Sequence, residues 1–336
     1  MNQKNNQIQH HPEKIGFQKP EDEIFPPMIV LSAANICNSN CVHCAFRRDN
    51  LRKREGNLYM SQELFTKIFD ECVKEKTIIR ITGTGEPFMN PHLFDVLLEG
   101  KKRGLVFGII TNGSLLVPEK SKALLDAGID MLEFSVDAGT KEEYEKIRVG
   151  LKFETLLKNI DFILNYRDKI KCLTKVVVSI IDQPDRVDVQ KAKEFWEAKK
   201  VDNVMIRKWL TYGILEEERY SKEVYLSPKN RVGCPYPWER MVILSNGKVT
   251  FCNFDVKDGD GYYMGDINQQ SIKEVWGSPK FNQWRELAAK KEFEKIPLCA
   301  KCDDWKYKSW QYNYLNSVRP SAAKKRNQDL EKKYNL

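Results

Sequence analysis

Three cysteines lie close together near the start of the chain, and their spacing is the clearest chemical signal in the sequence. Cys37, Cys41 and Cys44 occur in the run CNSNCVHC, directly after an apolar, strand-like run at 28–34. Thiolates in such a cluster bind zinc or iron-sulfur centres. The C-x-x-x-C-x-x-C spacing places all three sulfurs around one tight loop. Three thiolates cannot complete a four-coordinate metal site, so the spacing predicts a centre with one position left for another ligand.

A zinc knuckle is the alternative interpretation of the same loop. It would need a fourth ligand, either His43 or a distant cysteine.

A second set of cysteines lies in the last third of the chain. It consists of Cys234, Cys252, Cys299 and Cys302, with Gly247 between the first two. Four thiolates can complete a closed iron-sulfur cluster or a structural zinc ribbon. The two other cysteines, Cys72 and Cys172, lie in apolar surroundings and are predicted to be small core residues.

Length and composition predict a reducing, cytoplasmic compartment. The chain has 336 residues and nine cysteines, and it opens with the polar run MNQKNNQIQHHPEK instead of an apolar signal segment. It has no apolar run long enough to span a membrane. The formal charge is +8, with a basic stretch at 324–333 that lacks interleaved aromatic residues. We therefore expect a solvated tail and no nucleic-acid partner, while the basic excess is compatible with anionic substrates.

Strand-like and helix-like segments alternate through the first two thirds of the chain, which predicts an α/β fold with a parallel sheet. Six units are two short of a closed eightfold barrel, so we expect a partial (β/α)6 TIM-like barrel. The predicted strands are 29–34, 77–82, 106–111, 131–136, 175–181 and 203–209. The predicted helices are 62–74, 91–103, 118–126, 153–167 and 187–199.

The alternation ends after about Gly213, and a smaller α+β domain is predicted to follow. It contains a hairpin signal, Asn246-Gly247, in MVILSNGKVTFC, and helices at 271–275 and 279–289. We divide the chain into a flexible segment at 1–26, the barrel at 27–215, the smaller domain at 216–318 and a basic tail at 319–336.

Ligands of parallel sheets bind at the carboxyl ends of the strands. Three motifs follow successive predicted strands, and a helical Tyr144-x-x-x-Arg148 pattern comes after them. The motifs are Gly83-Thr84-Gly85-Glu86-Pro87, Thr111-Asn112-Gly113 and Ser135-Val136-Asp137. Glycines allow a backbone to approach a ligand closely.

The cysteine loop followed by these motifs in series resembles the radical S-adenosylmethionine (SAM) enzymes. The resemblance covers roughly residues 28–305 and implies that the first three cysteines hold a 4Fe-4S cluster whose open iron chelates SAM. It implies that His43 lies against the adenine, that Glu86 meets the SAM ammonium and that Arg148 pairs with the SAM carboxylate. The other implied SAM-binding residues are Gly83, Gly85, Asn112, Ser135 and Asp137.

The second cysteine set is similar to the auxiliary-cluster domain called SPASM, or Twitch in its shortened form. The longer form carries further cysteines after its C-x-x-C pair, and none follow Cys302. The resemblance therefore implies one auxiliary cluster, giving two 4Fe-4S clusters in all.

The layout resembles that of an aminocyclitol dehydrogenase, which implies oxidation of a small molecule with the auxiliary cluster as electron acceptor. Sulfatase-maturing enzymes have an aspartate where Asn253 stands, so that role is not expected. Asp255, Arg207 and Tyr212 are the predicted catalytic residues. The expected partners are a small-molecule substrate and a reductant such as flavodoxin or ferredoxin. Two alternatives remain: modification of a ribosomal peptide, and a non-catalytic iron-sulfur or zinc protein that would not cleave SAM.

Overall fold

A curved parallel sheet forms the centre of the molecule. The computed structural model describes residues 16–17, 19–44, 58–183, 185–208, 234–250, 252, 263–300 and 302. Strands β1 to β6 lie side by side in chain order and are all parallel. They are β1 (Met28–Leu31), β2 (Ile78–Ile81), β3 (Val106–Thr111), β4 (Met131–Ser135), β5 (Lys175–Asp182) and β6 (Asn203–Lys208). Because β6 ends the sheet instead of pairing with β1, the predicted partial barrel is confirmed.

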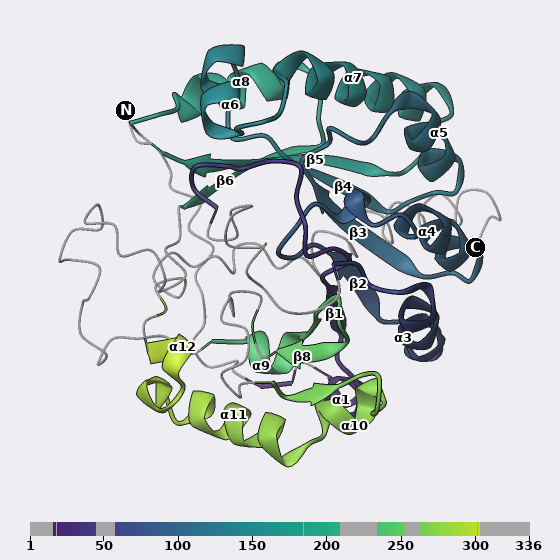
Figure 1. Cartoon of the computed structure of the whole chain (residues 1–336), viewed down its shortest axis with the longest axis vertical. Coiled ribbons are helices and arrows are strands. Elements are labelled where there is room, and N and C mark those ends of the chain that lie inside the picture. Colours follow the sequence, from purple (N-terminus) through teal and green to yellow (C-terminus); the bar gives the residue numbers. More distant parts are fainter. Residues whose placement is uncertain are drawn as a thin grey trace, which may run out of the picture.

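Helices connect the strands and cover the outer face of the sheet (Figure 1). Their apolar faces follow the predicted periodicity: Leu64, Ile68 and Cys72 of α3 are all buried. Helix α3 is capped at Ser61, whose side chain accepts a hydrogen bond from Leu64 N at 3.2 Å. The helices are α3 (Gln62–Glu75), α4 (Leu93–Lys102), α5 (Pro118–Asp126), α6 (Lys141–Ile147), α7 (Phe153–Lys169) and α8 (Val189–Ala198), and the 3-10 turn η1 (Pro87–Met89) precedes α4.

The C-terminal domain continues the same sheet. β7 (Met241–Ile243) pairs in parallel with β1, and the predicted hairpin follows as β8 (Lys248–Thr250). Gly247 turns the hairpin at φ +85°, a conformation that glycine adopts without a steric penalty. The remaining elements are α9 (Tyr236–Glu239), β9 (Gly265–Asp266), α10 (Ile272–Trp276), α11 (Pro279–Ala289), η4 (Phe293–Lys295) and α12 (Pro297–Ala300).

Helix α3 fastens the C-terminal domain to the barrel. The carboxylate of Glu71 accepts two hydrogen bonds from Ile272 N, at 3.1 and 3.0 Å, and so caps α10 from another element. One turn earlier, Lys67 Nζ donates to Ile267 O at 2.5 Å. A carboxylate at a helix N-terminus and an ammonium on nearby carbonyls are both electrostatically favourable. The two domains are thereby held in one orientation.

The described residues of the predicted flexible segment, 16–17 and 19–26, pack against the C-terminal domain. A short helix, α1 (Pro20–Ile24), lies there, and Trp276 Nε1 donates to Asp22 O at 2.9 Å. Phe25 is buried, and Phe17 meets the edge of the Trp276 ring. The polar composition of the segment gave no sign of these contacts, because their partners lie about 250 residues away in the sequence.

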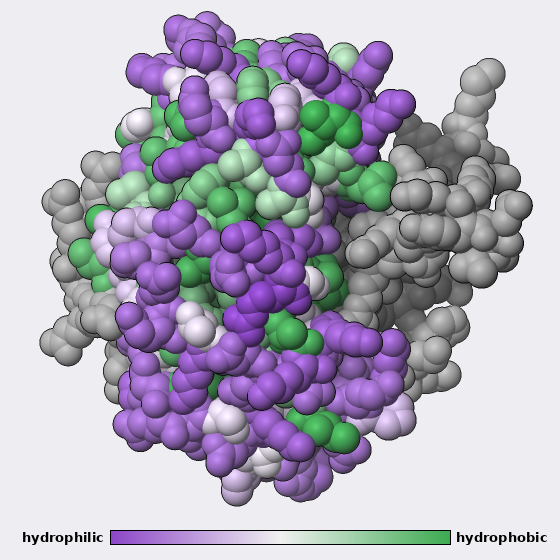
Figure 2. Space-filling view, turned by 90° about the vertical axis from the view of Figure 1, so that its right-hand side faces the viewer, coloured by the Kyte–Doolittle hydropathy of each residue, from purple (hydrophilic) through white to green (hydrophobic). Residues whose placement is uncertain are grey.

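Two apolar layers form the core. The larger one fills the space between the sheet and its helices, and the smaller one lies on the inner face of the barrel. The helical face of the surface is mostly hydrophilic, with apolar residues scattered over it (Figure 2). Among the described residues, no helix has the length and apolar content needed to cross a membrane.

Candidate functional site

The cysteine loop follows β1 and is largely enclosed. Cys41 is buried, while Cys37 and Cys44 are half-buried. Ser39 Oγ lies 3.1 Å from Cys41 Sγ, and Cys44 N donates to Cys41 O at 3.1 Å. The three thiols therefore belong to one tight, hydrogen-bonded loop, as the spacing predicted.

The glycine-glutamate-proline turn supports the start of this loop. Glu86 N donates to Ile36 O at 2.9 Å. A Cβ on Gly85 would lie 2.2 Å from Ile36 O, and a Cβ on Gly83 would lie 2.4 Å from Ser32 Oγ. Both glycines are therefore required for the close approach of two backbones. The sequence predicted a close approach to a ligand, and the structure shows a close approach to the loop that carries the cysteines.

The T-N-G turn meets the same loop through side chains. Asn112 Nδ2 donates to Asn38 Oδ1 at 2.8 Å, and Asn38 Nδ2 donates to Ser114 Oγ at 2.9 Å. Ser114 N closes the network by donating to Asn112 Oδ1 at 2.9 Å. Sequence reasoning missed Asn38 and Ser114, although an asparagine directly after Cys37 is a signal for such a contact. Asn112 here orders the cysteine loop, and its role toward SAM stays a prediction.

Glu86 joins the two turns from a buried position. Its carboxylate accepts from Thr111 Oγ1 at 2.6 Å, Asn112 N at 2.8 Å and Phe88 N at 3.3 Å. Burial raises the pKa of Glu86, and these hydrogen bonds oppose that shift. Three donors leave the carboxylate with limited capacity for a further one, so its contact with the SAM ammonium stays a prediction.

The end of α6 and the residues after it support the other side of the cysteine loop. Asn40 N donates to Val149 O at 2.8 Å, and Val42 N donates to Ile147 O at 3.0 Å. Ser39 Oγ also donates to Val149 O, at 3.1 Å. The cysteine loop is thus hydrogen-bonded to elements on both flanks.

A buried charge cluster lies directly beside Cys41. Arg148 Nη2 is 2.6 Å from Asp137 Oδ2, and Arg148 Nη1 donates to Cys41 Sγ at 3.6 Å. His43 Nε2 lies 3.3 Å from Asp137 Oδ2, and Ile181 N donates to Asp137 Oδ1 at 2.9 Å. The structure therefore brings three predicted SAM-binding residues, His43, Asp137 and Arg148, into one cluster with a cysteine. Ser135 is half-buried at the end of β4, next to this cluster in sequence.

Burial at the site disfavours the charged forms of the Cys37 thiol and the Tyr144 hydroxyl. Burial raises the pKa of the Cys37 thiol to about 11, and the neighbouring charges of Glu86 and Cys41 add to the shift. Burial also raises the pKa of Tyr144, whose ring is fully enclosed on α6. Iron ligation deprotonates such thiols.

The second cysteine set is distributed over three short segments. Cys234 precedes α9 and Cys252 follows β8, while Cys299 lies in α12 and its carbonyl accepts from Cys302 N at 3.2 Å. Helix α9 packs on α11, and η4 contacts both α11 and α12. Cys299 is buried in the core, and Cys234 and Cys252 pack against that core.

The donor chemistry of the two cysteine sets bears on whether they would hold a single metal ion or an iron-sulfur cluster. Among the described residues, no three cysteine, histidine or carboxylate side chains converge on a single metal ion. A cubane has another requirement, since each thiolate binds its own iron. Three thiols on one loop, with the Arg148 guanidinium on Cys41 Sγ, suit such a centre. Cys37, Cys41 and Cys44 would hold one cluster and Cys234, Cys252, Cys299 and Cys302 the other.

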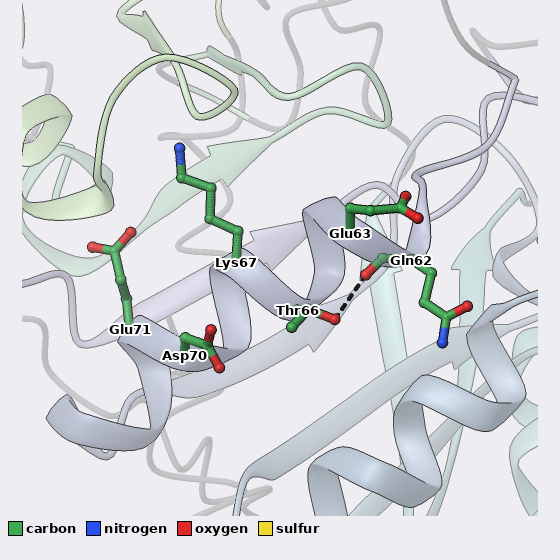
Figure 3. Close-up of a pocket in the computed structure, with 6 residues that line it drawn as sticks. All are labelled: Gln62, Glu63, Thr66, Lys67, Asp70 and Glu71. Carbon is green, nitrogen blue, oxygen red and sulfur yellow. Dashed lines mark hydrogen bonds between the residues drawn. The ribbon is translucent and has the colours of Figure 1, made fainter.

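Of the three predicted catalytic residues, the structure describes Arg207. Asp255 and Tyr212 lie outside the described residues. Arg207 stands on β6 and donates through Nη2 to Glu133 Oε1 at 2.6 Å. Figure 3 shows a pocket elsewhere, on the exposed face of α3, where Thr66 Oγ1 donates to Gln62 O at 2.9 Å. No predicted site residue lines this pocket, so it is separate from the chemistry.

Two family models match the chain. The radical SAM superfamily model covers residues 31–203, and the SPASM model, described as an iron-sulfur cluster-binding domain, covers residues 234–303. The chain therefore belongs to the radical SAM superfamily and carries a C-terminal SPASM domain. The predicted family and domain type are confirmed.

Similar proteins include a tungsten-containing aldehyde ferredoxin oxidoreductase cofactor-modifying protein from Pyrococcus furiosus. It is 24% identical over 319 residues, covering 82% of this chain and 86% of the relative. Among solved structures, BtrN in complex with AdoMet and 2-DOIA aligns with a TM-score of 0.53 and 17% identity, covering 82% of this chain and 92% of that one. Native anSMEcpe with bound AdoMet aligns with a TM-score of 0.60 and 17% identity, covering 82% and 88%. These likenesses establish a shared fold.

Proposed function

We propose that this radical SAM enzyme oxidises a small hydroxyl-bearing molecule, such as a sugar or an aminocyclitol. The substrate carbon loses a hydrogen atom, a base takes the hydroxyl proton, and an auxiliary 4Fe-4S cluster accepts the remaining electron. When bound, SAM and the first cluster supply a 5'-deoxyadenosyl radical that abstracts hydrogen. The proposal rests mainly on the continuous sheet that joins the two cysteine sets. The likeness in fold to BtrN, which covers 92% of that chain, supports it further.

The strand directions explain why the continuous sheet matters. The first cysteine loop follows β1. β7 is parallel to β1, and β8 is antiparallel to β7. Cys252, which follows β8, therefore leaves the sheet at the end opposite to the end at which the first cysteine loop follows β1. Glu133 on β4 and Arg207 on β6 belong to the same sheet. A substrate in the barrel interior would lose its hydrogen atom toward the first cysteine loop and its electron toward the second cysteine set.

The residues of the first site have separable tasks. Gly83 and Gly85 bring the backbone of one turn against the cysteine loop. Arg148 supplies the buried positive charge that would bind the SAM carboxylate, and Asp137 orients it at 2.6 Å. Protein binding and orientation of this kind leave the difficult chemistry to the cofactor.

The first test counts iron. Anaerobically reconstituted protein should hold about eight irons, as two 4Fe-4S clusters. Changing Cys37, Cys41 and Cys44 together to Ala should remove about half the iron and all SAM cleavage. Cys172→Ala is the matched control, since Cys172 belongs to neither set and donates to Leu125 O at 3.3 Å. Full iron in the triple variant, or zinc in the second site, would contradict the two-cluster model.

The second test follows the electrons. Perdeuterated glucose and myo-inositol are offered as probes, and deuterium is expected to enter 5'-deoxyadenosine and not to return to product. Cys299→Ala and Cys302→Ala should still cleave SAM but should fail to complete the oxidation. An isomerised or crosslinked product, formed without net oxidation, would favour the alternative reactions.

A further inference from the structure

The inner face of the barrel changes from apolar to polar along the strands. Paired residues of neighbouring strands point to the same face, and Glu133 pairs with Val177 while Arg207 pairs with Ile181. Met131, Val177 and Met205 belong to the inner apolar layer. Since side chains alternate along a strand, Glu133 and Arg207 stand on this inner face, two residues beyond Met131 and Met205.

Glu133 is a buried carboxylate with one oxygen in use. Its side chain is 1% exposed, and Oε1 accepts from Arg207 Nη2 at 2.6 Å. No donor among the described residues meets Oε2, although that oxygen is itself buried. Buried carboxylate oxygens are almost always hydrogen-bonded, because an unmet acceptor retains its desolvation penalty. The Oε2 atom thus requires a donor from outside the described chain.

The position of Glu133 suits a substrate contact. Ser135, a predicted SAM-binding residue, stands on the same face two residues further along β4, or roughly 7 Å away by strand geometry. Arg207 is 35% exposed, so the ion pair reaches from the enclosed interior to solvent. A small molecule held at Oε2 would therefore lie next to the SAM-binding residues.

We propose that Glu133 is a substrate-binding residue, whose Oε2 accepts a hydrogen bond from an uncharged hydroxyl group of the substrate, and that Arg207 is its positioning residue. This inference rests on the proposed function and names the substrate contact of the same site. An ammonium group would lie close to the Arg207 guanidinium, and a phosphate or carboxylate would meet a like charge at Oε2. A neutral hydroxyl meets neither repulsion, and hydroxyls donate well to carboxylates.

Equilibrium dialysis of reconstituted protein with SAM and no reductant tests this contact without turnover. The probes are myo-inositol and glucose, with 2-deoxystreptamine and glucose 6-phosphate as the cationic and anionic comparisons. Glu133→Gln preserves shape but places a donor where Oε2 stands, so binding of the neutral probes should weaken by roughly tenfold or more. Glu99→Gln, on the exposed face of α4, is the matched control and should bind as the wild type does.

Equal binding by Glu133→Gln and wild type would overturn the inference. It would also be overturned if neither neutral probe bound the wild type, or if a charged probe bound more tightly. Arg207→Met should weaken binding as well, because Oε1 loses the donor that fixes the carboxylate. The deuterium experiment separates the two proposals. Binding that depends on Glu133, without deuterium transfer, would refute the oxidation alone. Oxidation with an unchanged KM in Glu133→Gln would refute the substrate contact alone.

Discussion

Replacement of Arg148 by Met should reveal how strongly the buried charge cluster beside the cysteine loop is coupled. Arg148 and Asp137 have side chains only 9% and 1% exposed, and their charged atoms lie 2.6 Å apart. Removing one partner of a buried pair leaves an uncompensated charge and costs about 3–5 kcal/mol. Asp137 retains the Ile181 N–H donor and the contact with His43, so we expect the lower end, about 3 kcal/mol.

Asp137→Asn completes the double-mutant cycle. Asn tolerates the positive φ of +61° at this position and retains an acceptor for Ile181 N. With both charges of the pair removed, neither residue leaves an uncompensated buried partner, so the double variant should be less destabilised than the sum of the single variants by about 2 kcal/mol.

The free energy of unfolding in urea, followed by tryptophan fluorescence on protein purified without iron, measures each corner of the cycle. The solvent-exposed pair Lys122 and Asp126, on α5, provides the control and should show a coupling of at most about 0.5 kcal/mol. Additive effects of Arg148→Met and Asp137→Asn, within about 0.5 kcal/mol, would refute the claim that this pair acts as a unit. In reconstituted protein, Arg148→Met should also weaken SAM binding while the iron content stays unchanged.

Three further predictions concern the supports of the site. Gly85→Ala should reduce stability by at least about 2 kcal/mol and lower cluster occupancy, because its Cβ would meet backbone 2.2 Å away; Gly277→Ala, with its nearest contact at 3.5 Å, should be tolerated. Glu71→Ala should cost about 1 kcal/mol in urea unfolding because Ile272 N loses its acceptor while the Ser271–Glu274 capping box of α10 remains, and an unchanged midpoint would count against this role. Folding raises the pKa of Glu86 above its ordinary 4.5, so its stabilising contribution is complete below that pH and is lost as pH rises through the folded-state value. The stability difference between wild type and Glu86→Gln should therefore decline as pH rises above about 4.5, and a difference independent of pH would contradict the shift.

The sequence alone determined the elements and the kind of chemistry. Strand 106–111 and helices 118–126 and 279–289 have the predicted bounds, because local apolar periodicity and proline at the helix starts are visible in the chain. The cysteine loop and the motifs in series identified the family, since thiolate spacing and glycine turns are local patterns.

Only the tertiary structure decided how these parts meet. The parallel pairing of β7 with β1, the cap that Glu71 places on α10 and the packing of α1 against the C-terminal domain all join residues about 200 or more apart in the sequence. The pairing of Glu133 with Arg207 likewise depends on strand register, which places two residues 74 positions apart on one face. Such contacts depend on which surfaces can be buried together, and local patterns do not encode that choice.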